Sequence, residues 1–371
     1  MKAKIDFQKL EDVDGKEWIQ LTENAVRPYY INQEYEYAKI MESGGISPIY
    51  FLTIRDSNGK IGSGIVFYST KTRFGEILTS SGGPIVIDDS PQLLEEGLRR
   101  FVKEYKHKFL NIRIAFLPPS NLLNGRTILN AVRPAMTSIV DLTQPIEEIL
   151  RKVKKTRRSL IRRAIDSEIR IQELSSWDQW KDSYNLQILH SSEKGYPLYY
   201  TEDMWRRIFE KYSNTNRGKR VTFGAYIEDN MIGTIGLTII KGRATMDVLS
   251  ERLIDGVDNV SSLLMWRAIE YSKNIHCNSF NLSGLPSPNS ELIGLRIFKK
   301  SFGGAEIPIE EYCSSRFFAF TFNALRKADF SALINKAFQF LGADALFWKA
   351  KSAASQMPIA RQNAKNYRYN E

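Results

Sequence analysis

The chain has 371 residues, of which 43% are hydrophobic and 25% charged, so it holds enough apolar material for two domains of ordinary size. Its net charge of +10 favours an anionic partner, such as nucleic acid, acidic lipid or a phosphorylated substrate, without choosing among them. Two cysteines and three histidines exclude a disulfide scaffold and give no support for a metal site. No signal peptide pattern and no run of about 18 apolar residues occurs, which predicts a cytoplasmic protein without a spanning helix.

An internal repeat is the strongest structural signal in the sequence. In each copy, a β-hairpin pattern is followed by a helix pattern and then by a strand pattern. Equivalent positions stay 170 or 171 residues apart, which predicts a duplicated α/β unit. The hairpins cover residues 50–68 and 221–240, the helices begin at Pro91 and Ser261, and the strands contain Asn111 and Asn281.

The boundary between the copies is expected near residues 138–150. A strand pattern over 138–142 is followed by a helix start, with Thr143 as the cap and Pro145 near the first turn. The predicted domains are therefore 1–142, 143–316 and a C-terminal helical segment, 317–371.

The segment after this boundary is unusually basic. Residues 151–163 contain eight Lys or Arg, while apolar residues still recur at helical spacing. We therefore expect a helix that packs on one side and shows positive charge on the other. This face is either a solvated surface or a site for phosphates, with Arg151, Lys155, Arg158 and Arg162 as the candidate nucleic-acid-binding residues.

The segment 294–304, GLRIFKKSFGG, carries the most informative chemistry. It places Phe298 beside Lys299 on a loop or short helix after the last strand of the second copy. When an amine attacks an ester or thioester, a fixed ammonium can stabilise the oxygen that becomes negative, and a neighbouring aromatic ring can exclude water. From composition alone, a capping turn with a solvated lysine remains the alternative.

Residues 266–312 resemble the C-terminal signature of the Fem family, the aminoacyltransferases that add bridge residues to peptidoglycan precursors, together with BioF2-like acetyltransferase relatives. The resemblance implies a mixed-sheet α/β fold of two tandem GNAT-like acyltransferase domains, and it implies catalytic roles for Lys299 and Phe298. The residues that match the signature are Trp266, Ile269, Gly294, Phe298, Lys299, Phe302 and Gly303.

Two further segments extend the resemblance to the rest of the chain. Residues 154–164 are similar to the family's first helix in domain two, and Gln33, Tyr37 and Lys39 are similar to its N-terminal motif. The family's acceptor-binding residues correspond here to Tyr37, Lys39, Lys194 and Tyr196. Lys194 stands where the family has an arginine. A lysine keeps the positive charge but lacks the two-pronged hydrogen bonding of a guanidinium, which leaves the acceptor's identity open.

Neither copy has the glycine-rich motif that holds pyrophosphate in ordinary acetyl-CoA enzymes of this fold. We therefore expect no permanently bound cofactor and either aminoacyl-tRNA or acyl-CoA as the donor. The leading function is transfer of an acyl or aminoacyl group to an amine of a cell-envelope precursor, with an anionic or lipid-linked acceptor. The alternatives are an acyl-CoA N-acyltransferase for a polysaccharide or small amine, and a non-catalytic double-GNAT module that binds RNA.

The C-terminal segment, 317–371, has apolar residues at partly helical spacing with several basic residues nearby. Packing on the first domain is the leading interpretation. The alternative is contact with a membrane surface, which would place the protein peripherally at the inner face of the membrane.

Overall fold

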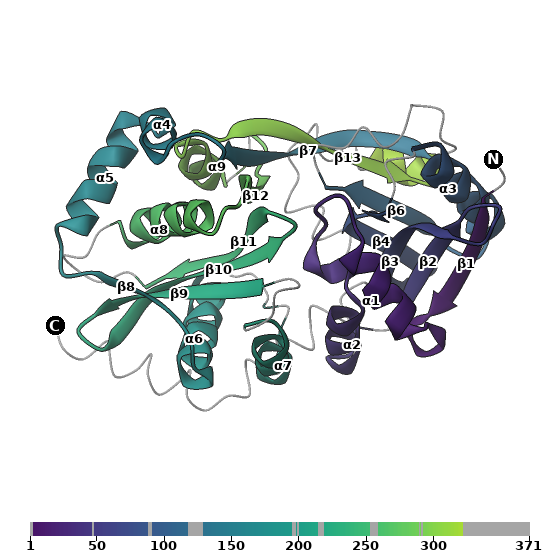
Figure 1. The fold of residues 1–371 in the computed structure, drawn as a ribbon, viewed down its shortest axis with the longest axis horizontal. Coiled ribbons are helices and arrows are strands. Elements are labelled where there is room, and N and C mark those ends of the chain that lie inside the picture. The colour runs from purple at the N-terminus through teal and green to yellow at the C-terminus, as the bar shows by residue number, and fades with distance from the viewer. Residues whose placement is uncertain are drawn as a thin grey trace.

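The computed structural model describes residues 3–46, 48–87, 91–117, 129–194, 198, 200–213, 219–252, 259–288, 290 and 292–321, with the backbone alone at 91, 133, 134 and 194. Its strands form one mixed sheet that runs through both halves of the molecule, with helices packed on its faces (Figure 1). The strand order is β1-β2-β3-β4-β6-β13-β7-β12-β11-β10-β9-β8, with β5 paired to β3.

The predicted duplication is confirmed. Each copy has three consecutive antiparallel strands, a helix, and a strand that pairs in parallel with the third. The first copy contains β2 (Ile49–Arg55), β3 (Ile61–Thr72), β4 (Gly75–Gly83), α3 (Pro91–Tyr105) and β6 (Asn111–Phe116). The second contains β9 (Lys219–Ile227), β10 (Asn230–Ile240), β11 (Arg243–Glu251), α8 (Val260–Asn274) and β12 (Ser279–Leu285).

The remaining elements flank these two units. Those before the first copy's β6 are β1 (Lys4–Lys9), η1 (Leu10–Asp12), α1 (Gly15–Glu23), η2 (Ile31–Gln33), α2 (Tyr35–Ser43) and β5 (Ile85–Val86). Those between the copies are β7 (Asn130–Asp141), α4 (Ile146–Lys152), α5 (Lys155–Ile165), β8 (Arg170–Glu173), α6 (Trp177–Lys194) and α7 (Glu202–Tyr212). The last two are α9 (Ile293–Lys300) and β13 (Ala305–Cys313).

Strand β13 connects the two halves of the sheet. It follows the second copy in sequence, yet it lies between β6 of the first copy and β7, and pairs antiparallel with both. Because β7 also pairs with β12, the two halves share a continuous hydrogen-bonded sheet. The domain limits at 142 and 316 remain a prediction, and residues 322–371 of the predicted C-terminal segment lie outside the described residues.

The expected single basic helix is divided into α4 and α5, which corrects the sequence prediction. Val153 and Lys154 adopt extended conformations between the two helices. The Val153 side chain is fully buried, and the Lys154 N–H donates to the Ser301 carbonyl at 2.9 Å instead of continuing the helix. The Arg158 side chain donates to the Val153 and Arg151 carbonyls, which satisfies acceptors left free at the break.

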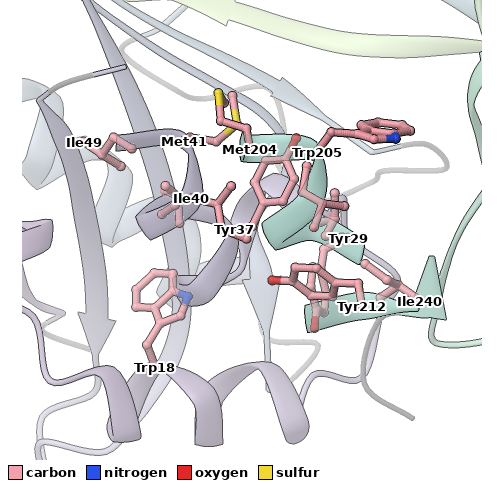
Figure 2. Close-up of a cluster of buried hydrophobic side chains, with 14 of the residues drawn as sticks. Trp18, Tyr29, Tyr37, Ile40, Met41, Ile49, Met204, Trp205, Tyr212 and Ile240 are labelled. Atoms are coloured by element: carbon pink, nitrogen blue, oxygen red, sulfur yellow. The ribbon is translucent and has the colours of Figure 1, made fainter. Parts of the chain in front are cut away.

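A buried apolar cluster packs the two copies against each other (Figure 2). It brings Trp18 of α1 and Met41 of α2 together with Met204 and Trp205 of α7. Burial of such large side chains is the main favourable contribution to packing, so the cluster holds the halves of the sheet in a defined arrangement.

Gln33 fixes the N-terminal loop to the first copy. Its side chain is fully buried, where Oε1 accepts from the Val66 N–H at 2.8 Å and Nε2 donates to the Ser81 carbonyl at 3.1 Å. These bonds give a structural role to a residue that the sequence linked only to a family motif.

We predict that Gln33→Leu lowers the free energy of unfolding by about 1–3 kcal/mol, because it leaves the buried Val66 N–H without an acceptor. Urea denaturation measures the change. Gln20→Leu, at an exposed position of α1, is the matched control and should change stability by about 0.5 kcal/mol or less. Equal effects of both substitutions would contradict the anchoring role.

Candidate functional site

The parallel strands β11 and β12 separate soon after they meet. They pair over only three residues, 243–245 with 279–281. Beyond this point each strand has a register irregularity against its other neighbour: Asp247 has no partner on β10, and β12 shifts against β7 between Asn281 and Gly284. Bulges bend strands, so these irregularities account for the gap between β11 and β12.

Hydrogen bonds from Asn281 hold the bend in β12. Its Oδ1 accepts from the Thr137 hydroxyl at 2.6 Å and from the Ser283 N–H at 2.9 Å. Ser283 adopts a positive φ of 63°, which is uncommon for a residue with a side chain, and its hydroxyl donates across the gap to the Met246 carbonyl. The local backbone geometry is therefore held by side-chain contacts.

Lys299 reaches the end of β12 from α9. Its side chain is 6% exposed, and its Nζ donates to the Gly284 carbonyl at 2.7 Å. Gly284 is itself exposed, with open space where a Cβ would lie. Burial lowers the pKa of Lys299 from its ordinary 10.5 to about 8, and no carboxylate pairs with it in the described part of the chain.

Phe298, the neighbouring residue on α9, faces a separate pocket of about 450 Å³. Its ring lies 4.7 Å from the Arg157 guanidinium. Arg157 in turn donates to the hydroxyls of Ser262, at 2.6 Å, and Ser301, at 3.0 Å. The residues of the pocket that bear on its chemistry are Arg157, His190, Glu251, Ser261, Ser262 and Phe298.

The N-terminus of α8 opens on this pocket, but a carboxylate already occupies it. Glu251 accepts from the Ser261 N–H at 2.9 Å. The positive end of a helix dipole usually attracts phosphate, and a fixed carboxylate at the same place repels it. The pocket therefore presents one guanidinium and one carboxylate rather than an open phosphate site.

The structure also reveals a buried charge pair that the sequence did not single out as functional. Arg220, 1% exposed, has its guanidinium 4.7 Å from the Trp205 ring, and its Nε lies 3.7 Å from Oδ2 of Asp247, whose side chain is 23% exposed. Loss of hydration in the protein interior raises the pKa of Asp247, while the positive charge of Arg220 opposes this shift. Nothing in the sequence joins a residue at the start of β9 to one in the middle of β11.

The predicted acceptor residues do not form one group. Tyr37 is buried, and its hydroxyl bonds to the Tyr200 hydroxyl at 2.6 Å, near the Arg220 guanidinium, which lies 5.6 Å from the Tyr200 ring. Lys39 is exposed on α2, 4.0 Å from a Glu36 carboxylate oxygen. The side chain of Lys194 and all of Tyr196 lie outside the described residues.

Of the candidate nucleic-acid-binding residues, three are exposed and one is engaged. Arg151, Lys155 and Arg162 face solvent, although Arg151 also pairs with Glu148. Arg158 is half-buried and caps the end of α4. Within the described ranges, no helix is long and apolar enough to cross a membrane, and no group of three or more His, Cys, Asp or Glu could hold a metal ion.

The fold is similar to those of three solved structures. FemX matches with a TM-score of 0.65 and 11% identity over 83% of this chain and 97% of that one. L-PGS from Bacillus licheniformis matches with a TM-score of 0.59 and 14% identity, over 85% and 96% of the two chains. The C-terminal domain of a putative lysylphosphatidylglycerol synthetase from Agrobacterium fabrum matches with a TM-score of 0.53 and 14% identity, over 85% and 97%.

No protein-family model and no curated protein matches the sequence. At these low identities, the structural matches define the fold. The predicted Fem-type fold of two GNAT-like units is confirmed.

The lowered pKa of Lys299 predicts a pH-dependent effect on stability. Between pH 8 and 10.5, the folded chain binds fewer protons at Lys299 than the unfolded chain does, so this residue's contribution to stability rises with pH. From pH 7 to pH 9.5, the free energy of unfolding of the wild type should rise by about 2 kcal/mol relative to the Lys299→Met variant.

Chemical denaturation at the two pH values measures this difference. Lys155→Met, at an exposed position, is the control, and its difference from the wild type should stay nearly constant. If the difference in the free energy of unfolding between the wild type and Lys299→Met also stayed constant, the Lys299 pKa would not be lowered.

Proposed function

We propose that this chain transfers an acyl or aminoacyl group to an amine in the gap between β11 and β12, with Lys299 stabilising the oxygen that becomes negative. The observation that carries the proposal is the buried ammonium of Lys299, which has a carbonyl partner and, among the described residues, no carboxylate partner. A buried cation in this state favours a negative charge that forms beside it.

The energetic argument follows from the pKa. A shift from 10.5 to about 8 corresponds to about 3 kcal/mol of lost stabilisation of the charged form. An ammonium carries three donors, and one of them is used by Gly284. Among the described residues the other two have no partner, and an oxyanion bound by them would restore the electrostatic stabilisation that burial removed.

The attacking amine loses a proton during the reaction, so the site needs a group that accepts this proton. The amine nitrogen attacks the carbonyl carbon of the donor, and the carbonyl oxygen takes the negative charge. Collapse of the intermediate breaks the bond to the donor's ester oxygen or thioester sulfur, which takes up the proton that the amine has lost and leaves as an alcohol or thiol. We assign the proton to Asp247. Its backbone follows Met246, whose carbonyl accepts from the Ser283 hydroxyl across the gap, and its carboxylate accepts from the Thr238 hydroxyl and lies beside Arg220.

The pocket beside Phe298 supports an aminoacyl donor over acyl-CoA. Glu251 occupies the helix terminus that would otherwise hold a pyrophosphate, which disfavours acyl-CoA in this pocket. The structural match to a putative lysylphosphatidylglycerol synthetase, a protein named for an aminoacylated lipid, supports an acceptor in the cell envelope. We therefore propose aminoacyl-tRNA as the donor and a lipid-linked or otherwise anionic envelope precursor as the acceptor.

We predict that Lys299→Ala lowers the rate of transfer to an amine acceptor by about 10²–10³, because it removes a donor to the developing oxyanion. Lys300→Ala, which removes an exposed ammonium from the next position of α9, is the matched control and should change the rate by less than about threefold.

The assay supplies radiolabelled aminoacyl-tRNA or acyl-CoA, with and without ribonuclease. Loss of transfer on ribonuclease treatment supports the tRNA donor, and resistant transfer from acyl-CoA would replace it with a CoA donor. A Lys299→Ala rate equal to that of the wild type would remove Lys299 from the mechanism.

Asp247→Asn should lower the transfer rate by about 10²–10⁴ if Asp247 accepts the proton. The pH profile separates this role from a structural one, because the wild-type rate should fall as pH drops through the pKa of Asp247, which the surrounding protein raises. The variant should lose this acidic limb and keep a low rate that does not fall further as the pH drops. Asp229→Asn, in the exposed turn before β10, is the control, and a retained acidic limb in Asp247→Asn would assign the proton to another group.

A further inference from the structure

The N-terminal part of α9 exposes a cluster of aliphatic side chains, here called the α9 tip: Leu292, Ile293, Leu295 and Ile297. Their exposed fractions are 55%, 38%, 41% and 53%. Ten large hydrophobic side chains are exposed in the described part of the chain, and four of them lie within residues 292–297. Apolar exposure concentrated in this way marks an interaction surface rather than ordinary scatter.

A basic surface lies next to the α9 tip. Helix α5 contains five Lys or Arg and no acidic residue. Its N-terminus touches the end of α9, where the Lys154 N–H donates to the Ser301 carbonyl and Arg157 stacks on Phe298. Figure 1 shows α4, α5 and α9 at the same corner of the molecule. Helix α9 has 8 residues and spans about 12 Å, so the α9 tip lies within about this distance of α5.

We propose that the α9 tip and the basic face of α5 dock this protein on an anionic lipid membrane. Aliphatic side chains enter the headgroup region favourably, and nearby Lys and Arg bind lipid phosphates. Leu295 also lines the pocket beside Phe298, so docking would bring the pocket close to the lipid surface. The inference does not depend on the transfer activity, although it would supply a lipid-borne acceptor to the proposed site.

Charge and side-chain type favour a membrane over other occupants. RNA-binding surfaces combine positive charge with exposed aromatic rings that stack on bases, whereas the α9 tip contains only Leu and Ile. Residues 322–371 carry eight Lys or Arg against three Asp or Glu. This segment has the same sign of charge as α5, so the net charge of both favours an anionic partner.

The test measures binding of the full chain to vesicles by co-sedimentation. One set of vesicles contains phosphatidylglycerol and phosphatidylcholine, and the other contains phosphatidylcholine alone. The wild type should bind the anionic vesicles at least tenfold more tightly, and this preference should fall in high salt. Ile293→Glu with Ile297→Glu, and separately Lys155→Ala with Arg162→Ala, should each weaken binding at least tenfold.

Matched controls add or remove the same charges elsewhere. Val26→Glu with Phe74→Glu alters two exposed apolar positions outside this corner, and Lys60→Ala with Lys71→Ala removes two exposed lysines. Both should bind vesicles like the wild type, and thermal unfolding should show that every variant folds. Lys299→Ala should also bind like the wild type, so lost transfer with intact vesicle binding separates this inference from the proposed function.

Three results would overturn the proposal. The first is a wild type that binds neither kind of vesicle, as expected if the C-terminal residues cover the tip. The second is a dimer in sedimentation velocity that Ile293→Glu with Ile297→Glu dissociates, which would make the tip an interface between two copies. The third is binding of tRNA that Lys155→Ala with Arg162→Ala weakens tenfold while vesicle binding stays unchanged.

Discussion

The separation of β11 from β12 is the constraint on which the candidate site depends. The two strands pair over three residues and then part, and the buried ammonium of Lys299 meets the backbone at the end of β12. If the strands stayed paired, the carbonyl of Gly284 would face a neighbouring strand and leave no room for a substrate. The bulge at Asp247 and the bend at Ser283 therefore part the two strands and leave the Gly284 carbonyl to Lys299.

The two copies of the repeat differ at this point. In the first copy, β4 and β6 remain paired over six positions, from Ile77 with Asn111 to Gly83 with Phe116. The equivalent strands of the second copy open, and α9 with its buried lysine follows this copy. Helix α2, which precedes the first copy, contributes Tyr37 and apolar residues that pack against α7, so this half of the chain supports the second copy, where the candidate site lies.

The sequence predicted the repeat because turn residues and apolar periodicity recur at a nearly constant offset. For residues 294–304 it left a loop or a short helix open, and the structure has helix α9 there. It could not predict the break at Lys154, which depends on a hydrogen bond to Ser301, far along the chain. The gap likewise depends on Asn281 bonding to Thr137. Such contacts are set by tertiary packing, and a local pattern carries no signal for them.

The central claim is that Lys299 binds the charged intermediate better than it binds the substrate. Two ligands test this directly: a phosphonate analogue of the tetrahedral intermediate and an unreactive substrate analogue. Calorimetry measures the affinity of each ligand for the wild type and for Lys299→Ala. The account predicts that the variant loses about 10²–10³ in affinity for the phosphonate and little for the substrate analogue. Equal losses for both ligands would show uniform binding and contradict it.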